Sequence, residues 1–228
     1  MKRALKRKRI VFVAGTDTGV GKTVFSLCLI RFLKQSGLSV AGLKPFCSGN
    51  REDAVRLWKE AACGLSLDQV NPFHFSAPLA PGSTEIRGRK PGLGTVLEHI
   101  EKIAGDYDVT VVEGIGGLCV PLSKGLLLAD IIQNLEAEVI LVARNALGTL
   151  NHTLLSVAEL KRRGKRVKNI FLSENVPPDQ SQLSNRPTLL QHVVNVRITM
   201  LPNLSEWPEL RFPTTGRERI FQKTLATI

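Results

Sequence analysis

Residues 16–23, TDTGVGKT, place a strong limit on how this chain can fold. They follow the apolar run IVFVAG, which is typical of a β-strand, and they precede a stretch with helical periodicity that ends before Gly37. The pattern is that of a phosphate-binding loop (P-loop), except that Thr16 stands at the position of its first glycine, with Gly15 just before it. The chain therefore needs a fold in which a strand leads through a tight loop into a helix N-terminus.

The loop contains the groups that hold a nucleotide triphosphate. Gly19 and Gly21 allow backbone N–H groups to turn toward phosphate oxygens, and the helix N-terminus adds a partial positive charge. Lys22 can reach the β- and γ-phosphates, and Thr23 can offer its hydroxyl to Mg²⁺. Together with Val20, these residues are the predicted ATP-binding loop. A glycine-rich turn without a phosphate is the alternative, which the strand before it and the helix after it disfavour.

Short β-branched runs alternate with helical patterns along the rest of the chain. Such alternation predicts an α/β fold of the P-loop NTPase type, with a mostly parallel sheet flanked by helices on both faces. We expect residues 1–9 to be a basic N-terminal extension and residues 10–228 to be a single domain. The predicted strands are 10–15, 39–45, 109–114, 139–144, 167–176 and 196–202; the predicted helices are 21–35, 52–64, 148–163 and 217–228; and the predicted loops are 75–92 and 176–187.

The net charge of +11 raises the question of a nucleic-acid partner. Two clusters of six cations, in residues 2–9 and 161–168, carry the excess, and outside them 19 positive residues face 20 negative ones. The second cluster closes a helical pattern, where cations suit the helix dipole. No aromatic residues alternate with either cluster, as base stacking would need. We therefore expect neither nucleic acid nor a membrane as a partner.

The sequence favours a cytoplasmic location. No apolar run reaches the roughly 20 residues that span a bilayer, and the basic residues 1–9 pass into a strand without a cleavable apolar segment. The four cysteines form no CxxC pair, and no histidine cluster accompanies them. We expect all four to be buried free thiols rather than zinc ligands or disulfides.

Polar residues follow the other predicted strands at their carboxyl ends, where ligands bind in parallel sheets. Lys44 ends the second strand, with Ser48 in the loop after it, and Glu113 ends the apolar run VTVV. Asp53 lies in the first turn of the next helix. Lys22 and Lys44 could both face a γ-phosphate, while Thr23, Asp53 and Glu113 supply oxygen ligands for one Mg²⁺. Taken singly, Lys44 could also be an ordinary exposed lysine and Asp53 a helix N-terminal acid.

Five segments of the chain together resemble a known family. They are GTDTGVGKT, KPFCSG, VNPFHFSAPLAPG, VEGIGGLCVPL and LGTLNH, and their order and spacing are similar to those of the dethiobiotin synthetase family. The resemblance covers residues 10 to about 210 and is weakest after Gly164. It implies an ATP-dependent cyclo-ligase of biotin biosynthesis, which closes a cyclic urea on 7,8-diaminopelargonic acid with CO₂ and ATP and releases ADP and phosphate.

The resemblance also implies roles for particular residues. Lys22 and Lys44 would be catalytic, stabilising a carbamate and the transferring phosphoryl group, and Thr18 and Ser48 would contact the substrate. The family is a homodimer with its active site at the subunit boundary, where Asn151 would help to hold the substrate carboxylate in the neighbouring subunit's site. Further nucleotide contacts would come from Glu113, Gly116, Asn175, Pro202, Leu204 and Glu209.

Three other classes of protein use the same loop. A partition or septum-site switch ATPase would bind DNA or a membrane, but such proteins carry a lysine early in the loop, where this chain has Asp17. An amidotransferase-type cobyrinate or cobyric acid synthase needs a glutaminase domain, for which 228 residues leave no room. A catalytically inactive relative is disfavoured because Lys22, Lys44, Asp53 and Glu113 are all present.

Overall fold

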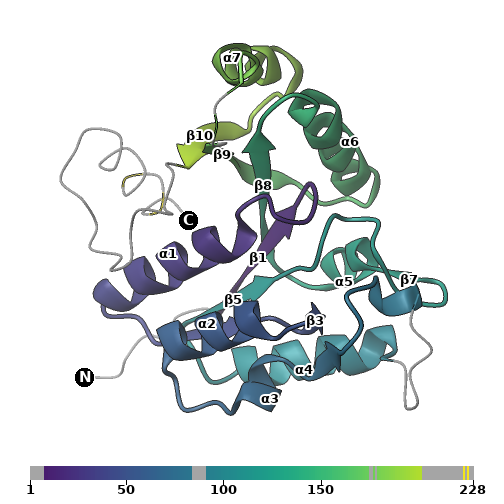
Figure 1. Cartoon of the computed structure of the whole chain (residues 1–228). Helices are drawn as coiled ribbons and strands as arrows, with labels where there is room; N and C mark the ends of the chain where they lie inside the picture. The colour runs from purple at the N-terminus through teal and green to yellow at the C-terminus, as the bar shows by residue number, and fades with distance from the viewer. Residues whose placement is uncertain are drawn as a thin grey trace.

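The computed structural model describes residues 8–83, 91–174, 177, 179–201, 223 and 225. A sheet of six strands, all paired in parallel, forms its centre (Figure 1). In spatial order the strands are β10 (Arg197–Leu201), β9 (Val167–Glu174), β8 (Glu138–Asn145), β1 (Arg9–Gly15), β5 (Val109–Glu113) and β2 (Val40–Leu43). Because every strand runs the same way, all six carboxyl ends lie at one edge of the sheet.

Helices cover both faces of this sheet. One face carries α1 (Lys22–Gln35) and α2 (Glu52–Ala61), and the other carries α4 (Leu93–Ala104), α5 (Leu128–Asn134), α6 (Thr149–Arg162) and α7 (Gln182–His192). Short elements complete the described part: α3 (Leu67–Val70), the 3₁₀ turn η1 (Pro81–Ser83), the parallel pair β3 (Phe46–Ser48) and β4 (Phe73–Phe75), and the antiparallel pair β6 (Pro121–Ser123) and β7 (Leu126–Leu127).

The alternation of side chains in β1 explains this two-faced packing. Val11 and Val13 belong to the core under α1, whereas Phe12 and Ala14 belong to the core under α4, α5 and α6. All four are at most 1% exposed, as expected for a central parallel strand buried on both faces. The predicted architecture, a mostly parallel sheet between two helical layers, is confirmed.

Most of the predicted elements are confirmed with shifts of a few residues at their ends. The helix predicted over 52–64 stops at Ala61, where Ala62 takes a left-handed conformation with φ 44°. The predicted loop 176–187 is partly wrong, because Gln182 to Pro187 belong to α7. Pro187 suggests a break, yet burial of Leu189 against the sheet holds this helix in place. Neither α4 nor α5 is among the predicted helices, and most of the helix predicted over 217–228 lies outside the described residues.

The cysteines match their prediction only in part. Cys28 and Cys47 are buried free thiols, Cys63 is half-buried, and Cys119 is exposed, so the expectation of burial was wrong for Cys119. No disulfide joins them. In the described part of the chain, no helix is both long and apolar enough to cross a membrane.

Loss of the aromatic contact between α1 and β9 should destabilise the fold. The rings of Phe25 and Phe171 lie 4.4 Å apart between centroids, and both residues are fully buried. We expect Phe25→Ala to lower the free energy of unfolding by about 3–5 kcal/mol, as a large cavity in a close-packed core does. Urea denaturation measures the change. Lys102→Ala is the control, since Lys102 is exposed on α4 and its loss should change stability by under about 0.5 kcal/mol.

The thiols should differ in reactivity in the native protein. Burial raises the pKa of Cys28 to about 12 and that of Cys47 to about 11, so neither forms the reactive thiolate near neutral pH. We expect iodoacetamide to label Cys119 first and to leave Cys28 and Cys47 unmodified, with site occupancy read by peptide mass spectrometry. The urea-denatured protein, in which all four thiols should react, is the control. Rapid native labelling of Cys28 would contradict the packing described above.

Candidate active site

The predicted phosphate-binding loop connects β1 to α1 at the carboxyl edge of the sheet. Gly19 has φ 69° and Gly21 has φ 99°, so both occupy left-handed conformations that favour glycine, and α1 begins immediately afterwards at Lys22. Gly15 is needed for a different reason. A β-carbon there would lie 2.7 Å from Lys22 Nζ, so only glycine lets the lysine fold back over the end of the strand.

Lys22 is almost buried and is held by backbone oxygens. Its Nζ donates to the carbonyl of Asp17 at 2.7 Å and to the carbonyl of Gly116 at 3.0 Å. Burial, followed by the positive charge of Lys44, lowers the pKa of Lys22 to about 8. Carbonyls satisfy its hydrogen bonds but do not neutralise it, so an anion in the cavity would stabilise its charged form.

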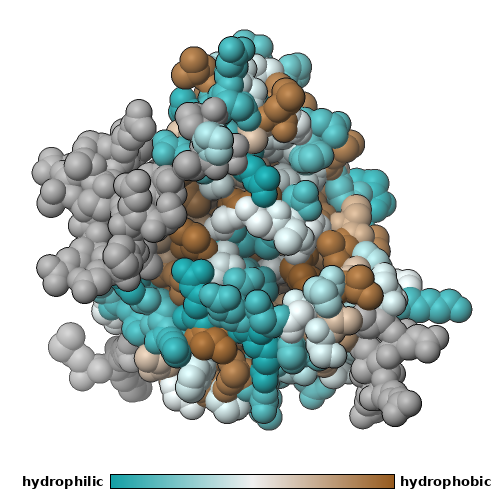
Figure 2. Space-filling view, viewed as in Figure 1, coloured by the Kyte–Doolittle hydropathy of each residue, from teal (hydrophilic) through white to brown (hydrophobic). Residues whose placement is uncertain are grey.

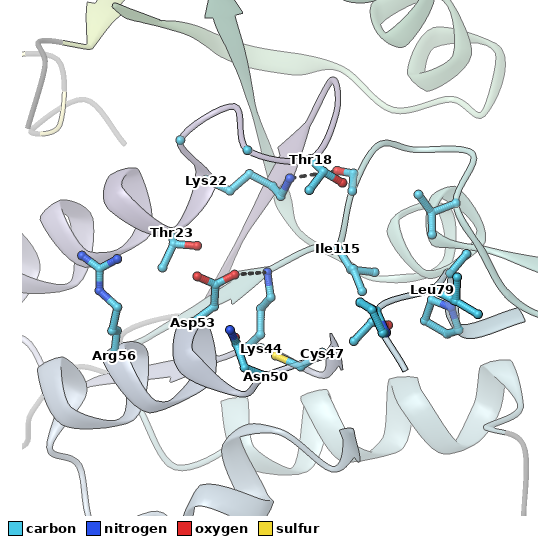
Figure 3. A pocket seen from close by; sticks show the side chains of 18 of the residues that line it. Thr18, Lys22, Thr23, Lys44, Cys47, Asn50, Asp53, Arg56, Leu79 and Ile115 are labelled. Atoms are coloured by element: carbon cyan, nitrogen blue, oxygen red, sulfur yellow. Dashed lines mark hydrogen bonds and ion pairs between the residues drawn. The ribbon is translucent and has the colours of Figure 1, made fainter. Parts of the chain in front are cut away.

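Lys44 instead sits among carboxylates. Its Nζ donates to Glu113 Oε1 at 2.6 Å and to the carbonyl of Gly114 at 2.9 Å, and it lies 3.7 Å from Asp53 Oδ2 (Figure 3). Burial opposes the charge of Lys44, but Glu113 and Asp53 outweigh burial and raise its pKa. Lys44 is therefore a permanently charged group beneath the loop.

Glu113 links the second lysine to the loop helix. Its Oε1 also accepts a hydrogen bond from Thr23 Oγ1 at 2.7 Å, while its buried Oε2 has no partner among the described residues. An unpartnered buried carboxylate oxygen beside a threonine hydroxyl and Asp53 is a fitting donor set for a hard cation such as Mg²⁺. In the described part of the chain no three His, Cys, Asp or Glu side chains lie together as a metal cluster.

These groups open into one cavity of about 610 Å³. The loop forms one wall, and the segments after β2 and β5 form the others, so residues far apart in the sequence meet there (Figure 3). Ser48 lines the cavity, and its buried Oγ has no partner in the described region. The predicted residues that line the cavity are Thr18, Gly19, Gly21, Lys22, Thr23, Lys44, Ser48, Asp53 and Gly116, and Glu113 hydrogen-bonds to two of them.

Some predicted residues lie elsewhere. Val20 is buried in the core next to the loop and does not line the cavity, so its nucleotide contact stays a prediction. Asn151 is exposed in the first turn of α6, outside this cavity, and its role in a neighbouring subunit also stays a prediction. The predicted nucleotide contacts Asn175, Pro202, Leu204 and Glu209 lie outside the described residues.

Other residues that line the cavity are not among the predicted site residues. Residues 78–81 close it opposite the lysines and lie in the predicted loop 75–92, which also belongs to one of the five segments of the family resemblance. Arg56, on α2, gave no signal, because a lone arginine in an amphipathic helix looks like an ordinary surface residue. The remaining unpredicted lining residues are Val24, Cys47, Asn50, Ile115 and Val120.

The fold and the loop together define a P-loop nucleotide-binding protein. A family model described as an AAA domain matches residues 9–210. Solved structures with the same fold include a plasmid partition protein from Borrelia burgdorferi, with a TM-score of 0.60 and 11% identity over 98% of this chain and 100% of that one. MinD from Aquifex aeolicus has a TM-score of 0.59 and 12% identity over 96% of this chain and 98% of its own.

Sequence relatives identify the family within that class. The ATP-dependent dethiobiotin synthetase BioD of Anaeromyxobacter sp. (strain K) is 40% identical over 200 residues, 85% of this chain and 90% of that protein. The enzyme of the same name from Methanocaldococcus jannaschii is 37% identical over 169 residues, 72% of this chain and 79% of that protein. This chain belongs to the family of ATP-dependent dethiobiotin synthetases, as the five segments noted above predict.

Proposed function

We propose that this protein forms the cyclic urea of dethiobiotin from 7,8-diaminopelargonic acid, CO₂ and ATP, as a step of biotin biosynthesis. The observation that carries the proposal is the convergence of Lys22 and Lys44 on one cavity, with Glu113 hydrogen-bonded to Lys44, in a chain whose relatives at 33–42% identity are named dethiobiotin synthetases. The same groups suit a reaction that moves a phosphoryl group onto an anionic acceptor.

The reaction has three steps. An amine of the substrate adds to CO₂ and loses a proton, which gives a carbamate. A carbamate oxygen attacks the γ-phosphorus of ATP, so a carbamic–phosphoric anhydride forms and ADP leaves. The second amine attacks the carbonyl carbon, phosphate leaves with the C–O electron pair, and loss of a proton closes the ring. Each step builds or moves negative charge and needs a fixed geometry more than an acid–base residue.

The two lysines have complementary roles in this proposal. Lys22 contacts the phosphate chain, because its hydrogen bonds to carbonyls leave its charge available to an anion. Lys44, whose charge is fixed by Glu113, holds the carbamate and the transferring phosphoryl group in line. Thr18 and the unpartnered Ser48 hydroxyl contact the diamine substrate.

A magnesium ion, when bound, neutralises phosphate charge. We assign its ligands to Thr23, Asp53 and Glu113, on the strength of the unpartnered Glu113 Oε2. Nucleotide binding by Val20 and Gly116, and by Asn175, Pro202, Leu204 and Glu209, is part of the same proposal.

We also propose a homodimer in which Asn151 completes the neighbouring subunit's cavity. Exposed leucines support a covered surface beside it: Leu147 is 88% exposed just before α6, and Leu155 is 62% exposed within α6. Figure 2 shows apolar side chains at the surface over α6 and α7. An interface there would remove these leucines from water.

A switch ATPase that binds DNA or a membrane is the competing function. Its support is the fold, since MinD and a partition protein share it, but at 11–20% identity that likeness concerns the fold alone. The sequence relatives are synthetases, and Asp17 occupies the loop position where switch proteins have lysine.

A phosphate-release assay separates the two functions. We expect the purified protein with bicarbonate, Mg²⁺ and ATP to release phosphate only when 7,8-diaminopelargonic acid is added, in a one-to-one ratio with dethiobiotin measured by mass spectrometry. Phosphate release that ignores the diamine but responds to DNA or lipid vesicles would instead support a switch ATPase.

Replacement of Lys44 should separate catalysis from nucleotide binding. Lys44→Ala and Lys44→Met should each lower kcat by roughly a hundredfold or more, the effect of removing a group that stabilises transition-state charge, while ADP affinity changes little. Both variants leave the buried carboxylate of Glu113 without its partner, so thermal unfolding must be measured for each of them. Lys44→Met preserves the packing of the aliphatic part of the lysine side chain. Lys102→Ala, an exposed change on α4, is the control. Near-normal turnover in the methionine variant would remove Lys44 from the catalytic residues.

A further inference from the structure

Arg56 is a cation that lines the cavity but takes no part in the proposed ring closure. It lies on α2, three residues after Asp53, a spacing that places both side chains on one face of the helix. Both line the cavity, together with Thr23 and Val24 from the first turn of α1. In Figure 3 the guanidinium rises from α2 toward α1, on the side of Thr23 and Asp53 away from Lys44.

The groups that an arginine in this helix would normally pair with are engaged elsewhere. The carboxylate of Asp53 lies 3.7 Å from Lys44, and Glu60, one turn further along, forms an ion pair with Arg31 at 2.5 Å. Glu52, one turn before, makes no bond to Arg56 either, and within the described chain the guanidinium of Arg56 has no hydrogen bond or ion pair. Its exposed guanidinium is therefore free to meet a ligand.

The charge balance of the cavity indicates what that ligand is. Lys22 and Lys44 face Asp53 and Glu113, so these four groups are neutral together. Arg56 is the remaining charged residue among the described lining residues, so the lining together with Glu113 behind it carries one net positive charge. A magnesium-bound nucleotide is still an anion, and a guanidinium matches phosphate oxygens in both charge and geometry.

We infer that Arg56 binds the non-bridging oxygens of the α- and β-phosphates of the nucleotide from the α2 side. This inference rests on the nucleotide site of the proposed function, but not on ring closure. Its place beside Thr23 and Val24, and away from Lys44 and Ser48, puts it at the nucleotide end of the cavity rather than at the acceptor end. Arg56 is thus a binding residue for both ATP and ADP.

Calorimetric titration of the full-length protein with Mg-ADP and Mg-ATP, without the diamine, tests the inference. Arg56→Ala should weaken both nucleotides by roughly tenfold, as loss of an exposed charge-assisted hydrogen bond does. Arg56→Lys should retain most of the affinity because the positive charge remains. A small loss is expected, since the planar guanidinium fork is gone. Lys59→Ala removes an exposed cation of the same helix outside the cavity and should bind like the unmodified protein.

Other results would overturn the inference. Unchanged affinity for both nucleotides in Arg56→Ala excludes the contact, and a loss confined to ATP moves it to the transferred phosphate. If Arg56→Ala lowers the unfolding temperature of the nucleotide-free protein enough to account for its weaker binding, Arg56 has a structural role instead. The titration contains no diamine, so its result does not depend on ring closure. If the unmodified protein forms no dethiobiotin but Arg56→Ala still weakens nucleotide binding, this inference stands and only the proposed function fails.

Discussion

The buried ion pair between Lys44 and Glu113 is the interaction on which the site depends. Its atoms lie 2.6 Å apart, and the two side chains are 3% and 0% exposed. Isolating either charge in the interior would cost several kcal/mol, so the pair requires β2 and β5 to end together. The sheet provides this, because Leu43 pairs with Val112 in the parallel register and the next residue of each strand carries one of the two charges. A change of register would separate them.

This dependence explains which parts of the molecule could be predicted from the sequence. The strands are short runs of β-branched residues, and the groups at their carboxyl ends must meet in a parallel sheet, so Lys44 and Glu113 were found together from local patterns. In contrast, α7 depends on long-range burial of Leu189, which outweighs the local signal of Pro187. Arg56 was missed because its role follows from the engagement of Asp53 and Glu60 by other cations, which only the three-dimensional structure reveals.

The two lysines also show how one cavity can hold two cations close together despite their mutual repulsion. Lys22 is held by neutral carbonyls, and burial together with the charge of Lys44 lowers its pKa to about 8. Lys44 is held by carboxylates, which raise its pKa. An incoming phosphate therefore gains most from Lys22, whereas Lys44 is already paired with Glu113 and lies near Asp53. In the proposed reaction, binding and alignment are thus separated between Lys22, at the start of α1, and Lys44, which follows β2.

The scaffold alone does not decide between a switch ATPase and a synthetase, because both use the same loop at the same edge of the sheet. The difference lies in what covers the phosphate end. Here the segment after β2, with Lys44 and Ser48, and the turn at residues 78–81 bound a cavity of about 610 Å³. That volume suits a small molecule beside a nucleotide. The walls of the cavity, rather than the loop, therefore select the acceptor.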